Sequence, residues 1–124
     1  MYLQQRPTIF IVEDNLMNQQ LIARELESLG GKIYFFTTGE DCIAGLDLNP
    51  SIVVLDYNLE GQINGLETLE QIRRHDPSIF VVLFSSQRDL ANAENQERYG
   101  DFNFLEKRDY SFALLGRMVK ARMA

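Results

Sequence analysis

Four short apolar runs in this sequence are separated by helix-like segments, and each run stops at a polar residue. The runs cover residues 9–12, 52–55, 81–84 and 102–105. The polar residues that follow them are Glu13, Asp14, Asp56, Ser85, Glu106 and Lys107. Short runs of β-branched and aromatic residues between helices are typical of strands buried on both faces of a parallel sheet. This pattern restricts the chain to an alternating α/β fold.

A fifth strand is predicted at residues 32–36, where mixed polarity and a lysine at the start indicate an edge position. Helices are predicted from residue 16 to the glycine pair 30–31, from 38 or 39 to 49, from 65 to 76, within 88–99, and from about 111 onward. The repeated strand–helix order with short links predicts a doubly wound, five-stranded parallel sheet with helices on both faces. In such a sheet the expected strand order is 2-1-3-4-5.

Two of the predicted helices differ in how well their apolar faces are defined. In the first helix, the inward face is expected to comprise Leu16, Gln20, Ala23, Leu26 and Leu29, with Leu21, Ile22 and Met17 broadening it. The segment 88–99 is almost entirely polar and offers little beyond Leu90 and Tyr99 for packing. A helix with so narrow an apolar face is expected to be weakly held.

Length and composition limit the class of protein. A chain of 124 residues is expected to form a single domain spanning residues 1–124. The net charge of −6 argues against direct nucleic-acid binding. No apolar run approaches the roughly 20 residues of a membrane span, and no signal peptide is recognised. The lone Cys42 fits a reducing compartment, so a cytoplasmic location is expected.

The carboxyl ends of neighbouring parallel strands meet at one crevice, which would bring Glu13 and Asp14 opposite Asp56. Two carboxylates about 5 Å apart repel by roughly 3 kcal/mol at an effective dielectric constant near 20. A cation would relieve this repulsion, and ligands that are all oxygen suit Mg²⁺, with Mn²⁺ as an alternative. The structural alternative is that Glu13 and Asp14 merely cap the following helix.

The same crevice contains the groups that phosphoryl transfer requires. A carboxylate can act as the nucleophile toward phosphorus, and Asp56 is the candidate because no acid adjoins it and a dry strand precedes it. A divalent cation and the Lys107 ammonium would neutralise the phosphoryl oxygens, and the Ser85 hydroxyl could donate to one of them. Taken singly, a lysine after a strand is usually solvated and a serine there usually caps a helix.

These motifs together resemble a known family. They are Glu13-Asp14-Asn15, Asp56-Tyr57-Asn58-Leu59, Ser85-Ser86 and Phe104-Leu105-Glu106-Lys107. Their order, their spacing and their position at strand ends resemble those of the receiver domain of two-component response regulators. The resemblance covers nearly the whole length of the chain. The resemblance implies a flavodoxin-like fold that accepts a phosphoryl group from a histidine kinase or a histidine phosphotransfer protein.

By this resemblance, Asp56 is the phosphoacceptor, and Lys107 binds the phosphoryl group. Mg²⁺ is held by Glu13, Asp14, Asp56 and the backbone carbonyl of Asn58. Ser85 and Phe104 are the expected switch residues. The output is then a changed surface on the fourth helix, fifth strand and fifth helix, through which a homodimer could also form. The output partner itself is not identified by the sequence.

The sequence departs from the family pattern at several positions. Arg108 follows the lysine where a proline with a cis bond is usual, and a trans bond is expected because a cis non-proline bond costs roughly 2.5–4 kcal/mol. The loop after Asp56 has one extra residue before Gly65, with Glu60 near the crevice. Phe104 lacks the hydroxyl of the commoner tyrosine, and Ser86 replaces a smaller residue.

Other classes of function fit the sequence less well than a phosphorylated receiver. The main alternative is a pseudo-receiver that binds partners without phosphorylation. A phosphatase with an aspartyl nucleophile would need a second acid where Asn58 stands, so the chain is expected to be a self-phosphorylating, slowly self-dephosphorylating switch rather than a turnover enzyme. Flavin binding is disfavoured because acids occupy the phosphate loop, and no glycine–lysine nucleotide loop is present.

Overall fold

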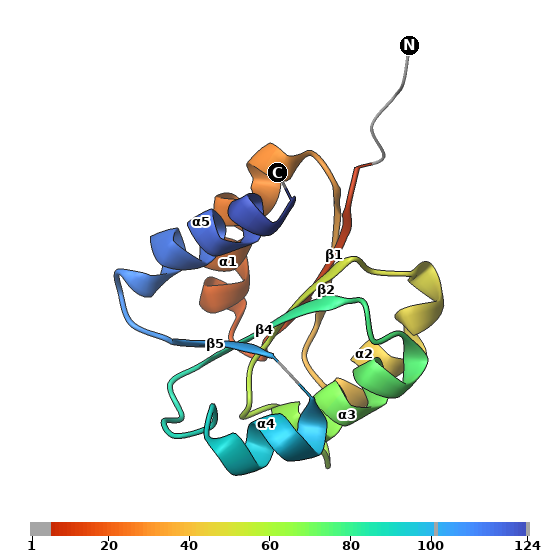
Figure 1. Cartoon of the computed structure of the whole chain (residues 1–124). Coiled ribbons are helices and arrows are strands. Elements are labelled where there is room, and N and C mark those ends of the chain that lie inside the picture. The colour runs from red at the N-terminus through yellow and green to blue at the C-terminus, as the bar shows by residue number, and fades with distance from the viewer. Residues whose placement is uncertain (1–5, 101, 124) are drawn as a thin grey trace.

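The computed structural model describes residues 6–100 and 102–123, which form a five-stranded parallel sheet covered by helices on both faces (Figure 1). The strands are β1 Thr8–Val12, β2 Lys32–Phe36, β3 Ile52–Leu55, β4 Phe80–Ser85 and β5 Asn103–Glu106. They lie in the order β2-β1-β3-β4-β5, with β2 at one edge. The predicted fold class and strand order are therefore confirmed.

The helices divide between the two faces of the sheet. They are α1 Leu16–Leu26, α2 Gly39–Ala44, α3 Gly65–His75, α4 Ala93–Tyr99 and α5 Ser111–Met123, with 3₁₀ turns η1 Glu27–Leu29 and η2 Leu46–Leu48. Helices α1 and α5 pack together on one face, whereas α2, α3 and α4 cover the other (Figure 1). None of the helices within the described ranges is long and apolar enough to cross a membrane.

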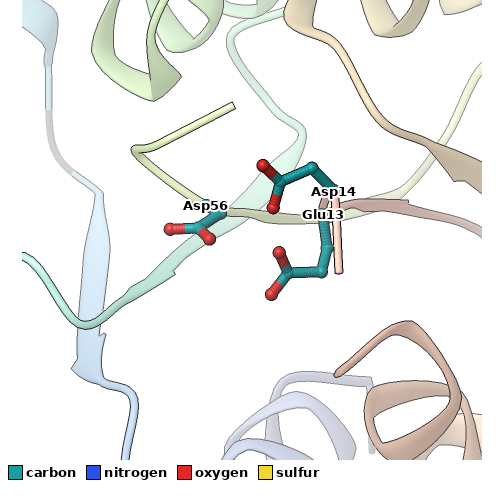
Figure 2. Close-up of side chains that lie close together, drawn as sticks. All are labelled: Glu13, Asp14 and Asp56. Carbon is teal, nitrogen blue, oxygen red and sulfur yellow. The ribbon is translucent and has the colours of Figure 1, made fainter. Parts of the chain in front are cut away.

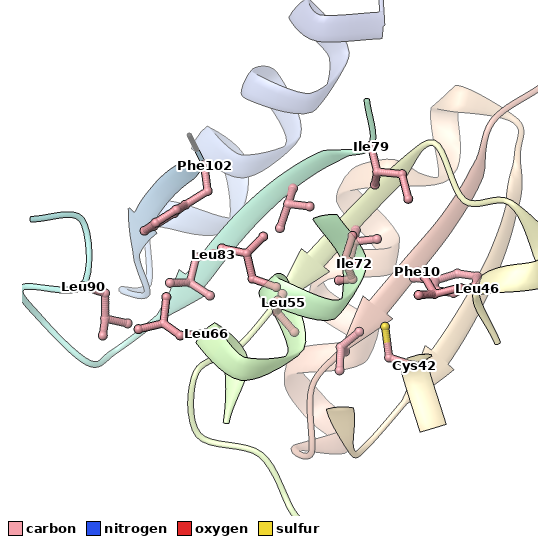
Figure 3. Packing of buried hydrophobic residues seen from close by; sticks show 14 residues of the cluster. Phe10, Cys42, Leu46, Leu55, Leu66, Ile72, Ile79, Leu83, Leu90 and Phe102 are labelled. Carbon is pink, nitrogen blue, oxygen red and sulfur yellow. The ribbon is translucent and has the colours of Figure 1, made fainter. Parts of the chain in front are cut away.

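The central strands are buried on both sides, which explains their continuous apolar runs. Alternate residues of each strand point to opposite faces. In Figure 3, Leu55 and Leu83 of the sheet lie near Leu66 and Ile72 of α3, and Phe10 of β1 lies beside Leu46 of η2. Full burial of each such side chain stabilises the fold by roughly 1.5–3 kcal/mol. The sheet is therefore a rigid base for the loops at its carboxyl end.

Helix α1 has a different inward face from the one expected. Leu16 and Met17 are each 72% exposed and Gln20 is also exposed, whereas Gln19, Ile22 and Leu26 are buried. The assignment of Leu16, Met17 and Gln20 to the inward face was wrong. Ile22 and Leu26 pack into the core between the sheet and α5, and the Gln19 amide on this inward face donates a hydrogen bond of 2.7 Å to the Glu13 backbone carbonyl.

Helix α4 spans Ala93–Tyr99, the later part of the segment 88–99 within which it was predicted. Asp89 has a positive φ of 62°, which a continuous helix does not allow, and the Asn92 side chain caps the helix by accepting from the Asn95 backbone N–H. The Gln96 side chain makes two hydrogen bonds to the Phe102 backbone, one at its N–H and one at its carbonyl. Amide side chains thus supplement the narrow apolar contact of this segment.

Cys42 provides a test of the packing between α2 and the sheet. Its side chain is fully buried, and burial raises the pKa of the thiol to about 12, well above its usual range. At pH 8 the thiolate fraction is then about a thousandfold lower than in the unfolded chain. We expect native protein to resist alkylation at pH 8, and mass spectrometry should show labelling only as denaturant unfolds the chain. Rapid labelling of the native protein would contradict this packing.

Candidate functional site

Three acidic side chains meet at the carboxyl end of the sheet, as the strand-end pattern predicted. Glu13 and Asp14 follow β1, and Asp56 follows the neighbouring β3 (Figure 2). One oxygen from each carboxylate lies within 4.8 Å of the other two. The Asp56 backbone N–H continues the sheet by donating to the Val12 carbonyl at 3.0 Å. The two strands therefore determine how close the acids lie.

Lys107 reaches this cluster from the end of β5. Its Nζ atom lies 2.6 Å from Glu13 Oε1 and 2.8 Å from Asp56 Oδ2. The three side chains are well buried, with exposed fractions of 12% for Lys107, 3% for Glu13 and 8% for Asp56. The Lys107 backbone N–H also bonds to the Ser85 carbonyl at 2.9 Å. An ammonium from across the sheet is thus paired directly with two of the three acids.

Burial and pairing act in opposite directions on these groups. Burial raises the pKa of Glu13, and the nearby Asp56 charge adds to this, although Lys107 opposes both. Burial alone would lower the pKa of Lys107, but its hydrogen bonds to Asp56 and Glu13 outweigh burial and raise that pKa. Lys107 is therefore protonated at neutral pH. Three carboxylates against one ammonium leave two formal negative charges.

A divalent metal ion fits the charge and chemistry of this site. The cluster offers only oxygen ligands, which Mg²⁺ and Mn²⁺ favour, and its excess charge equals that of one such ion. Neither His75, at the far end of α3, nor the core residue Cys42 belongs to the cluster. Asn58, whose backbone carbonyl is a predicted ligand, is exposed on the loop two residues beyond Asp56.

The loop position of Asp56 is fixed by backbone contacts. Its Oδ1 atom accepts a hydrogen bond of 2.7 Å from the Tyr57 N–H, which orients the carboxylate. The Tyr57 carbonyl in turn accepts from the Gly65 N–H at 2.8 Å, at the start of α3. Helix α3 is capped by reciprocal bonds between Asn64 and Glu67. The Asp56 carboxylate is therefore held between the sheet and a well-capped helix.

The two predicted switch residues lie on neighbouring strands. Ser85 ends β4, is fully buried, and accepts a hydrogen bond from the Gln87 N–H at 3.2 Å. Phe104 of β5 is half-buried, stands beside Leu83 in the register, and packs against the core on the α3 side. The structure places both residues in the β4–β5 pair that ends beside Lys107.

Residue 108 lies in a loop held by ion pairs. No peptide bond in residues 6–100 or 102–123 is cis, as expected for Arg108. Glu106 pairs with Arg108 and also with Arg88, whose Nε lies 2.8 Å from Glu106 Oε1. These bonds join the loops after β4 and β5. Neither this bridge nor the Gln19 contact is predictable from the sequence, because a helical glutamine and exposed arginines give no distinguishing signal.

This geometry accords with the comparisons to known proteins. The sequence matches the family of response regulator receiver domains over residues 9–117, so the chain belongs to that family. Members of this family are phosphorylated on an aspartate, use Mg²⁺ and interact with histidine kinases or phosphotransfer proteins. The resemblance drawn from the strand-end motifs is confirmed.

The similar curated proteins are regulators of greater length. The DNA-binding transcriptional regulator NtrC of Salmonella typhimurium is 27% identical over 119 residues, which are 93% of this chain and 25% of that protein. The transcriptional regulatory protein CssR of Bacillus subtilis is 34% identical over 82 residues, covering 66% of this chain and 36% of CssR. This chain therefore spans about a quarter to a third of these relatives.

Solved structures share the fold. The response regulator TrrA of Thermotoga maritima, in complex with Mg²⁺ and BeF, has a TM-score of 0.78 at 23% identity, covering 93% of this chain and 97% of TrrA. The BeF3-activated DrrB receiver domain has a TM-score of 0.77 at 24% identity, covering 97% of this chain and all of that one. At these identities the likeness supports the fold alone.

Proposed function

We propose that this domain is a phosphorylation switch in which Asp56 accepts a phosphoryl group from a histidine kinase or a histidine phosphotransfer protein. The observation that carries the proposal is the buried contact of Lys107 with Glu13 and Asp56, beside the third acid, Asp14. A lysine and three acids from separate strands supply the nucleophile, the metal ligands and the charge neutralisation for phosphoryl transfer.

The protein groups have separate tasks in this reaction. Glu13, Asp14, Asp56 and the Asn58 carbonyl would hold Mg²⁺, which when bound neutralises phosphoryl oxygens. An Asp56 carboxylate oxygen attacks the phosphorus and forms an oxygen–phosphorus bond. The bond between phosphorus and the donor breaks, and its electron pair leaves with the donor. Lys107 already lies 2.8 Å from Asp56 Oδ2 and can pair with an oxygen of the incoming group.

The signal would pass through Ser85 and Phe104. A phosphoryl group on Asp56 would draw the Ser85 hydroxyl away from the Gln87 N–H, and Phe104 would repack beside it. The changed surface would comprise α4, β5 and α5, the face where a partner or a second copy could bind. In this role the domain is a switch with slow self-dephosphorylation and not a turnover enzyme.

The direct test is phosphorylation by a small donor. We expect wild-type protein incubated with acetyl phosphate and Mg²⁺ to gain one phosphoryl group in its intact mass, and removal of Mg²⁺ by EDTA to abolish the gain. Asp56→Asn should gain none, because its amide is a poor nucleophile toward phosphorus. Asp47→Asn, an exposed residue in η2 outside the cluster, is the matched control and should behave as wild type.

Two results would count against the proposal. An unmodified wild type would favour the pseudo-receiver alternative, in which partners bind without phosphorylation. Equal labelling of the Asp56→Asn variant would move the acceptor to another residue. A pull-down from the native host that compares wild type with Asp56→Asn would then show whether binding depends on this carboxylate.

A further inference from the structure

The loop between β3 and α3 is held by a carboxylate from the first turn of α2. Glu40 Oε2 accepts a hydrogen bond of 2.8 Å from the Gln62 backbone N–H, and the Ile63 backbone also contributes to this contact. These bonds, led by the one from Gln62, lower the pKa of Glu40, so the carboxylate is ionised at neutral pH. The charged Glu40 carboxylate therefore accepts from loop N–H groups that would otherwise bond only to water.

Gly61 shows how closely the loop approaches this carboxylate. Its φ is +88°, a conformation that residues with a side chain rarely adopt. A Cβ atom on Gly61 would lie 2.7 Å from Glu40 Oε1 and 2.9 Å from Oε2. The loop backbone at residues 61–63 thus lies directly against the carboxylate, which leaves no room for a side chain between them.

The residues around Glu40 make this contact part of the fold. Thr38 caps α2 by accepting from the Asp41 N–H and forms an isolated parallel β-bridge with Glu60. Gly39 is buried, and a Cβ there would lie 2.0 Å from the Thr68 hydroxyl of α3. The first turn of α2 is therefore fixed to α3, and Glu40 extends from this fixed base to the loop.

The anchored loop is the one that carries Asn58. It leaves Asp56 at the cluster and returns to α3 at Gly65, so its two ends are fixed by the sheet and the helix. Between them, residues 57–64 include the additional residue that the family pattern lacks. A longer loop has more conformations to lose when a carbonyl must be directed at an ion. A contact at 61–63 removes part of that freedom before the ion binds.

We propose that Glu40 is a positioning residue for the metal site: it anchors the loop after Asp56 and so presents the Asn58 carbonyl to a divalent cation. The inference rests on the proposed function, because it concerns the Mg²⁺ that phosphorylation requires. Glu40 touches neither the cation nor the phosphoryl group and acts through the loop backbone. Residues that hydrogen-bond a metal ligand directly typically change metal affinity 10- to 100-fold, and Glu40, which acts through the loop at Gln62, is expected at the lower end of that range.

The test compares Glu40→Ala with Asp41→Ala, which removes the same charge from the same helical turn but has no described contact with the loop. Two quantities are measured: hydrogen exchange of the Gln62 amide in metal-free protein by NMR, and the Mg²⁺ dissociation constant by calorimetry. We expect Glu40→Ala to speed Gln62 exchange at least tenfold and to raise the dissociation constant about tenfold. Asp41→Ala should change each less than twofold, and Glu40→Gln should restore part of both.

Each contrary result has a distinct meaning. Unchanged Gln62 exchange in Glu40→Ala would overturn the anchor itself. Faster exchange with an unchanged Mg²⁺ affinity would overturn the positioning role, since the loop would then be loosened without consequence for the metal. A wild type that binds no Mg²⁺ would overturn the proposed function and the inference with it, and the exchange data would show that the loop contact was nevertheless real.

Discussion

The Lys107→Met variant is expected to be less stable than wild type by about 3 kcal/mol without metal, and to recover most of this loss in Mg²⁺. Methionine keeps the apolar stem but removes the ammonium that lies 2.6 Å from Glu13 and 2.8 Å from Asp56. Acids within 4.8 Å of one another then lack a counter-charge, and their repulsion is about 3 kcal/mol at an effective dielectric constant of 20. Urea unfolding followed by circular dichroism measures the loss.

The same variant should bind Mg²⁺ at least about tenfold more tightly, because a competing cation has been removed from the ligands. Lys120→Met, at an exposed position of α5, is the matched control and should alter neither stability nor affinity measurably. A stability loss in Lys107→Met that saturating Mg²⁺ does not reduce would show that the lysine and the metal ion do not share these carboxylates.

Gly65→Ala is expected to reduce the free energy of unfolding by about 3 kcal/mol or more and to weaken Mg²⁺ binding. A Cβ on Gly65 would lie 2.3 Å from the Asp56 carbonyl oxygen and 2.7 Å from the Tyr57 Cα. Both neighbours are backbone atoms, which cannot move aside as a flexible side chain would. The substitution must therefore displace either α3 or the chain that carries the acceptor. Chemical denaturation and Mg²⁺ calorimetry measure the two effects.

Gly100→Ala distinguishes this clash from an ordinary glycine effect. Gly100 has a φ of +78°, but a Cβ there meets nothing within 4 Å. Its φ of 78° and ψ of 174° lie in a region almost exclusive to glycine, so its replacement should cost about 1–3 kcal/mol through backbone strain alone and leave Mg²⁺ affinity unchanged. A Gly65→Ala variant whose Mg²⁺ affinity is unchanged, like that of Gly100→Ala, would mean that the close approach of α3 to Asp56 is not maintained in solution.

Much of the fold could be predicted because the strands are short, dry and separated by clear helix boundaries. The strand at 32–36 and the helix start at Gly65 agree with the structure. The rotation of α1 could not be predicted, because its apolar residues surround the helix, and the buried side also carries the hydrogen bond from Gln19 to the Glu13 carbonyl. Periodicity contains no information about such a bond.

The candidate site was predictable for a similar reason. In a parallel sheet the ends of β1, β3 and β5 are placed by topology, so Glu13, Asp56 and Lys107 could be assigned to one crevice from their positions alone. The loops were not predictable. The contact of Glu40 with Gln62 and the pairing of Arg88 with Glu106 join residues from different loops or helices, and the sequence does not indicate their partners.

The paired bonds from Gln96 to the Phe102 backbone have a mechanical consequence. The Gln96 amide bonds to both the N–H and the carbonyl of Phe102, the residue before β5. A shift of α4 along the sheet would therefore also displace the start of β5. A displacement that begins near Ser85 would then move α4 and β5 together, and a partner bound on this side would contact both elements.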